Sequence, residues 1–190
     1  MFERTVQGFA QWVAAQSWSV GLHESFYMYN WIESIHVLTL ALSLGALCVV
    51  DLRTLGVVMT DVPASKVAAR FARPMLIGFI VMFVTGIALY AAIPVRTTQS
   101  IWFRLKMLLL LAAALNAWLF HRHMSRSVVS WDRDPVPPRR TRLAGGVSLS
   151  LWAAIVVCGR FIAYDWYDCG ETNAPFIDWA AGCAAALPTE

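Results

Sequence analysis

Four long apolar stretches constrain the fold of this chain more than any other feature. A membrane-spanning helix needs about 20 mostly apolar residues, because each residue rises about 1.5 Å and the hydrocarbon layer is about 30 Å thick. Stretches of this kind cover residues 26–50, 74–93, 101–120 and 146–164. They are continuously apolar and do not alternate, which excludes a transmembrane β-barrel. We therefore predict an all-α membrane protein, built as a four-transmembrane-helix bundle.

Composition supports the same class. Of the 190 residues, 58% are hydrophobic and 14% are charged, whereas soluble domains have about 45–50% and about 25%. These proportions exclude a soluble globular enzyme, a disordered chain and a nucleic-acid-binding domain. The four cysteines lack the paired spacing of a zinc site. The predicted partner is the lipid bilayer, with no nucleic acid.

Charged residues and helix breakers mark the expected ends of the spans. Asp51 and Arg53 close the first span, and Pro94 ends the second. Pro74 is expected to open the second span, because proline is tolerated in the first turn of a helix. The pair Gly145-Gly146 is expected to open the fourth.

Basic residues are distributed unevenly between the two sides of the predicted bundle. The connections 51–73 and 121–145 share one side, and the opposite side has only Arg4 and Arg96 outside the spans. The positive-inside rule then predicts a bacterial inner-membrane protein with both termini extracytoplasmic, in the periplasm. The ten basic residues of the two connections are Arg53, Lys66, Arg70, Arg73, Arg122, Arg126, Arg133, Arg139, Arg140 and Arg142.

The chain ends are expected to lie outside the bilayer. Residues 1–22 form an N-terminal segment in which Phe2, Val6, Phe9 and Val13 recur at helical spacing, predicting an amphipathic interfacial helix. The transmembrane domain covers residues 23–166, and an acidic extracytoplasmic tail covers 167–190. In that tail we expect Cys169 and Cys183 to form a disulfide bridge, because disulfides persist in this compartment.

Five ionisable residues interrupt the spans, where each costs a few kcal/mol or more and therefore needs a partner or a purpose. Counting from the span centres places His36, Lys106 and Arg160 at similar depth on three helices. One interpretation is a buried ion-pair network, with Glu33 holding Lys106 or Arg160. The other is a cofactor site, because a bundle histidine is the usual haem ligand and basic residues can neutralise haem propionates. The five residues are Glu33, His36, Arg104, Lys106 and Arg160.

A haem here would lack a second histidine at the same depth. His121 lies 15 residues beyond Lys106, which is about 22 Å deeper on a helix. The sequence therefore favours one b-type haem with His36 as an iron ligand. The second ligand would be Lys106, or His23 if the chain folds back over the site, or no protein residue. Small residues such as Gly86 would let a flat cofactor or a helix approach closely.

Three short motifs resemble those of a known superfamily. They are Tyr29-Asn-Trp-Ile-Glu-Ser-Ile-His36, Thr85-Gly86-Ile87 and Trp102-Phe-Arg-Leu-Lys106. They resemble the HemJ-type protoporphyrinogen oxidases and the related CopD-like copper-resistance membrane proteins. The resemblance implies that His36 and Lys106 are tied to a b-type haem. The closing segments of the fourth span look more like an uncharacterised family of four-helix bacterial membrane proteins.

These observations lead to one leading hypothesis and two alternatives. The first is a haem-binding membrane protein with a redox role, passing electrons between the quinone pool and an extracytoplasmic or membrane partner near the tail. Arg160 would be a propionate or structural counter-charge, and porphyrinogen oxidation is the more specific version. The alternatives are a non-catalytic structural or assembly subunit of a larger complex, and copper handling. An oligomer is compatible with each of them.

Overall fold

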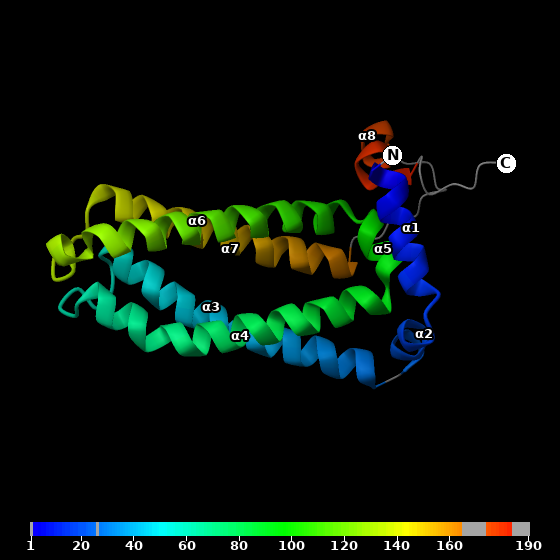
Figure 1. The fold of residues 1–190 in the computed structure, drawn as a ribbon, viewed down its shortest axis with the longest axis horizontal. Helices are drawn as coiled ribbons and strands as arrows, with labels where there is room; N and C mark the ends of the chain where they lie inside the picture. The colour runs from blue at the N-terminus through cyan, green and yellow to red at the C-terminus, as the bar shows by residue number, and fades with distance from the viewer. Residues whose placement is uncertain (1, 26, 165–173, 184–190) are drawn as a thin grey trace. The chain divides into compact units, whose positions relative to one another are not determined.

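The computed structural model describes residues 2–25, 27–164 and 174–183, without the side chains of residues 2 and 123–130. Every regular element in these ranges is a helix, which confirms the all-α prediction (Figure 1). The helices are α1 (Phe2–Ala14), α2 (Ser17–Glu24), α3 (Met28–Leu55), α4 (Ala64–Ala92), α5 (Pro94–Gln99), α6 (Ile101–Trp131), α7 (Arg139–Tyr164) and α8 (Pro175–Ala181).

Four of the described helices are long and apolar enough to cross a membrane. They are α3, α4, α7 and the part of α6 over Ile101–Arg122. Large apolar side chains on them are exposed, including Leu42 at 69%, Phe83 at 70% and Leu111 at 69%. Such a surface is unfavourable in water and favourable against lipid tails. The chain therefore has the character of a multi-pass membrane protein.

Two predicted span boundaries lie inside helices. Pro74 does not open α4, which begins at Ala64 and contains the proline in its interior. Gly145 and Gly146 are likewise inside α7, which begins at Arg139. The prediction took the end of the apolar run for the end of the helix. Backbone hydrogen bonding continues into polar residues beyond that run, since a helix needs no apolar side chains outside the hydrocarbon.

The described chain divides into two compact units. The first comprises Met1–His36, Val84–Met107 and Val156–Glu190. In this unit α1 packs against α5, and the two helices lie side by side in Figure 1. Gln7 and Ala10 of α1 are almost fully buried. Ser19 of α2 donates a hydrogen bond of 2.6 Å to the carbonyl of Ala91, which holds α2 at the end of α4.

The second unit comprises Val37–Phe83 and Leu108–Ile155. Arg53 is completely buried there, rather than solvated as its assignment to a connection implied. Its guanidinium donates to the carbonyls of Val62 at 2.8 Å and Asp134 at 3.2 Å. These bonds join the connection between α3 and α4 to that between α6 and α7. Asp51 is also buried, at 8% exposure.

Asp132 caps the start of α4 from the far end of α6. The backbone N–H and the hydroxyl of Ser65 donate to the two carboxylate oxygens of Asp132, at 2.7 and 2.6 Å. Desolvation acts to raise the pKa of Asp132. The hydrogen bonds from Ser65 and the nearby charges of Arg53 and Arg133 outweigh it and hold this pKa below its ordinary value of 3.8.

The predicted interfacial segment and tail are described in part. Residues 2–24 form two helices, and the first ends at Ala14. Within 167–190 the described residues are 174–183, which contain α8. Cys183 is disulfide-bonded, whereas Cys48 and Cys158 are free thiols. Its predicted partner Cys169 lies outside the described residues, so that pairing stays a prediction.

Candidate functional site

His36 lies against α4 in the first unit. Its Nδ1 shares a hydrogen bond of 2.8 Å with the hydroxyl of Thr85. A Cβ atom added to Gly86 would lie 3.6 Å from the imidazole Cε1, so the absent side chain brings the α4 backbone close to the ring. The structure thus brings together two of the predicted site residues, His36 and Gly86.

The bond to Thr85 matters for metal chemistry. A histidine that binds a metal through one ring nitrogen usually holds the other in a hydrogen bond, which fixes the tautomer and the ring orientation. In the tautomer in which Nδ1 donates its hydrogen to Thr85, Nε2 is the nitrogen that would bind a metal. The residues present therefore fit a single axial imidazole ligand with a backbone surface beside it.

Lys106 forms a second contact in the same unit, between α6 and α7. Its Nζ would lie 3.4 Å from a Cβ atom on Gly159. Among the described residues, none forms a hydrogen bond or ion pair with this ammonium group.

Arg160 faces away from this contact. The residue is exposed, unlike its neighbour Cys158, which is 3% exposed. Its guanidinium lies over the ring of Tyr164, 4.2 Å from the centroid. This geometry suits an arginine whose stem covers apolar surface and whose head reaches a membrane interface.

The alternative interpretation was a buried ion-pair network in which Glu33 holds Lys106 or Arg160. Glu33 forms no ion pair with Lys106 or Arg160 within the described ranges. His36 Nδ1 shares its hydrogen bond with the hydroxyl of Thr85. Within the described ranges, the structure therefore lacks the ion pairs of Glu33 that the structural network required.

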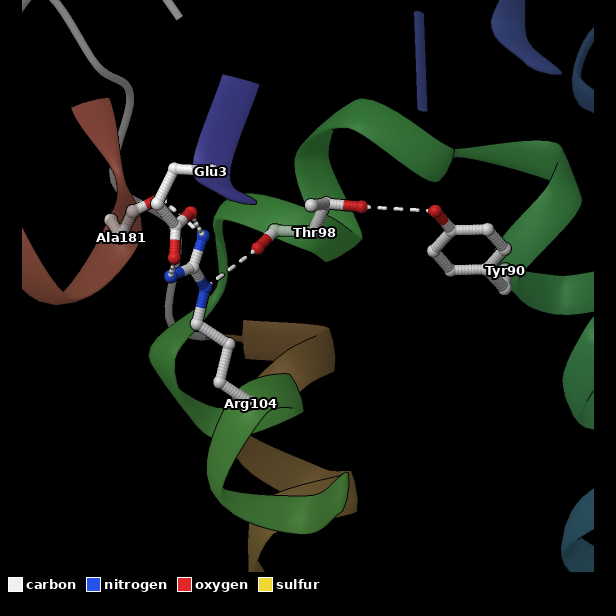
Figure 2. Close-up of polar contacts among 5 residues, drawn as sticks. All are labelled: Glu3, Tyr90, Thr98, Arg104 and Ala181. Atoms are coloured by element: carbon white, nitrogen blue, oxygen red, sulfur yellow. Dashed lines mark hydrogen bonds and ion pairs between the residues drawn. The ribbon is translucent and has the colours of Figure 1, made fainter. Parts of the chain in front are cut away.

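Arg104 has partners that its position in the sequence did not indicate. Figure 2 shows its guanidinium between the carboxylate of Glu3 and the carbonyls of Thr98 and Ala181. The bonds to Glu3 are 3.0 and 2.8 Å, that to Ala181 is 2.9 Å and that to Thr98 is 3.1 Å. Arg104 therefore joins α1, α8 and the end of α5 to the first turn of α6. The sequence indicated this role of Arg104 only by placing an arginine in an apolar segment that has no acidic residue nearby.

Aromatic pairs surround these contacts. Trp102 stacks on Phe161 with ring centroids 4.4 Å apart, which fixes the start of α6 against α7. Phe103 stacks on Tyr90 at 5.6 Å, and the Tyr90 hydroxyl shares a hydrogen bond with Thr98 (Figure 2). The tryptophan of the Trp102–Lys106 motif therefore packs between helices, next to the turn that carries Lys106.

Two of the other histidines lie at the surface of the described chain. His23 on α2 and His121 on α6 are both exposed. Among the described residues, no cluster of three or more histidine, cysteine or acidic side chains could hold a metal ion. A metal bound entirely by such protein ligands therefore has no site there. A haem differs because its porphyrin supplies most of the iron ligands and the protein only one or two.

Comparison with known proteins places the chain in a family. The sequence model of DUF6644, described as a family of unknown function, matches residues 17–165. The chain belongs to the DUF6644 family. The match includes all four candidate membrane helices together with His36, Gly86, Lys106 and Arg160. No curated protein and no solved structure matches the chain.

Proposed function

We propose that this DUF6644 member is an integral membrane protein that binds one b-type haem through His36. The hydrogen bond between His36 Nδ1 and Thr85 is the observation that carries the proposal, because it orients the imidazole as metal-binding histidines are oriented. Gly86 supports it by leaving a backbone surface beside the ring. The site lies on α3 and α4, two of the four apolar helices.

Lys106 provides the second part of this proposal. It is either the other iron ligand or a contact to a propionate or substrate. Haem propionates are anionic, so they would compensate an ammonium group that has no ion pair among the described residues. Arg160 is proposed as a propionate or structural counter-charge, and its guanidinium lies over the ring of Tyr164.

A bound haem would supply one-electron chemistry. The role proposed for it is electron transfer between the quinone pool and an extracytoplasmic or membrane partner near the C-terminal tail. Oxidation of a porphyrinogen is the narrower form of the same proposal. The protein would lie in the bacterial inner membrane with both termini in the periplasm, as the ten basic residues of the two connections favour.

Iron and copper analysis of the protein, purified from haem-replete cells, tests the cofactor directly. The proposal expects about one iron per chain together with a Soret band. Copper without a Soret band would support copper handling instead. Stoichiometric partner chains without a chromophore would support a non-catalytic subunit, and either result would overturn the haem proposal.

The orientation has its own test. Single cysteines placed at Arg4 and at Arg140 of a variant without Cys48 and Cys158 can be labelled in intact cells with a membrane-impermeant maleimide. The proposed orientation expects labelling at position 4 and not at 140. The opposite pattern would place the termini in the cytoplasm.

A further inference from the structure

An apolar groove with a basic rim lies in the second unit, between the end of α3 and the first turns of α7. Its volume is about 610 Å³. Most of its lining is aliphatic, and two arginines stand at the beginning of α7. The residues that line it include Leu55, Arg139, Arg142, Leu143, Gly146 and Val147.

Two adjacent glycines explain the groove. A Cβ atom on Gly145 would collide with the Thr54 hydroxyl and lie 3.1 Å from the carbonyl of Asp51, so α3 and α7 touch there. The next residue, Gly146, is less crowded: its Cβ atom would first meet Leu55, at 3.9 Å. The helices are thus held together at one glycine, and the missing side chain of the other leaves space beside the contact.

The two arginines are available to a ligand. Arg139 and Arg142 are exposed, and in the part of the chain that the structure describes neither guanidinium has a hydrogen bond or ion pair. Leu143 and Val147 follow on the same helix and are exposed at 60% and 47%. Two cations therefore stand beside the apolar groove, at the beginning of a candidate membrane helix. The beginning of such a helix is where lipid headgroups are expected.

We propose that this groove binds an anionic phospholipid. The phosphate group would lie between Arg139 and Arg142, and an acyl chain would lie along Leu55, Leu143 and Val147. Basic pockets beside membrane helices recognise anionic headgroups in this way, by charge at the surface and apolar contact below it. A zwitterionic lipid also carries a phosphate, but its own cationic headgroup balances that charge, so the two arginines attract it less than an anionic lipid. The site is separate from His36 and holds whether or not haem is bound.

Native mass spectrometry of the purified full-length chain, titrated with dioleoyl phosphatidylglycerol or dioleoyl phosphatidylcholine, measures the preference. The expected result is about 30-fold tighter binding of the anionic lipid, since each arginine near the surface contributes about fivefold. Equal binding of the two lipids would overturn the proposal. Displacement of phosphatidylglycerol by an equal concentration of inorganic phosphate would also overturn it, because the acyl chain would then contribute nothing.

Variants locate the site. The double variant Arg139→Gln/Arg142→Gln should bind phosphatidylglycerol only as tightly as phosphatidylcholine. Arg140→Gln is the matched control, because Arg140 is exposed on the same turn but does not line the groove. Gly146→Leu should fill the groove and weaken phosphatidylglycerol binding with both arginines present. If Arg140→Gln weakened binding as much as the double variant, general surface charge would account for the preference and the proposal would fail.

Discussion

The Glu3 carboxylate of α1 and the Arg104 guanidinium of α6 form two parallel hydrogen bonds, 3.0 and 2.8 Å long, across 101 residues of sequence. The same guanidinium donates to the carbonyl of Ala181 in α8. Both side chains are partly exposed, at 40% for Glu3 and 26% for Arg104. This arrangement ties the first and the last described helix to the start of a membrane-spanning segment.

Removing the charge of Glu3 should loosen the first helix. Glu3→Gln should lower the free energy of unfolding by about 1 kcal/mol, because a partly exposed bidentate pair contributes at the upper end of the range for surface ion pairs. Thermal unfolding in detergent measures the loss, and limited proteolysis shows whether α1 becomes accessible. Arg4→Gln is the control, because Arg4 is exposed on the same turn. Equal effects of the two variants would contradict this role of Glu3.

Close packing at Gly78 predicts a coupled pair in the second unit. A Cβ atom there would collide with the hydroxyl of Ser43, which is 3% exposed. Gly78→Ala should therefore destabilise the protein by about 1–3 kcal/mol. Ser43→Ala should recover part of the loss in the double variant, and a double-mutant cycle of unfolding midpoints measures the coupling. Gly45→Ala is the control, because its Cβ atom would meet nothing within 4 Å. Additive effects at Gly78 and Ser43 would contradict the predicted contact.

The capping of α4 by Asp132 predicts a pH-dependent contribution to stability. Since the folded-state pKa lies below the ordinary value of 3.8, the contribution is fully present above 3.8 and is lost as the pH falls through the folded pKa. Asp132→Ala should cost about 1 kcal/mol at pH 7, as for the loss of a helix cap. Unfolding midpoints at pH 7, 5 and 3 should show equal deficits at the first two values and a smaller one at the third. A deficit independent of pH would show that the carboxylate charge is not involved.

The disulfide of Cys183 predicts how many free thiols the protein has before and after reduction. In denatured, unreduced protein an alkylating reagent should modify two cysteines, Cys48 and Cys158, which are free thiols. After reduction it should modify all four. Peptide mapping of unreduced protein should recover Cys169 linked to Cys183. Recovery of Cys183 linked between two chains would replace the predicted internal bridge with a dimer.

The sequence predicted the membrane helices well, because hydropathy over 20 residues is a local property that needs no knowledge of packing. Its errors at Pro74 and Gly145 come from the same source, since hydropathy reports where lipid ends and not where the backbone leaves the helix. Gly145 serves packing instead: a side chain there would collide with Thr54, and this depends on how α3 and α7 pack.

The candidate site was only partly accessible from sequence. Polar residues within apolar spans identified His36, Lys106 and Arg160. Their similar depth in the predicted bundle did not specify the direction in which each side chain points from its helix. In the structure, Arg160 lies over Tyr164 on the exposed side of its helix. Thr85 gained its role only when α4 brought its hydroxyl to the imidazole. Glu3 and Arg104 are too far apart in sequence for any helical periodicity to pair them.

Reduced-minus-oxidised absorption spectra of the purified protein, of His36→Ala and of His121→Ala test the central claim most directly. His121 is the control because it is an exposed histidine far along α6 from the proposed site. The account predicts a Soret band and sharp reduced bands in the unchanged protein and in His121→Ala, with loss or a clear shift of these bands in His36→Ala. An unchanged spectrum in His36→Ala, or no Soret band in protein from haem-replete cells, would contradict it.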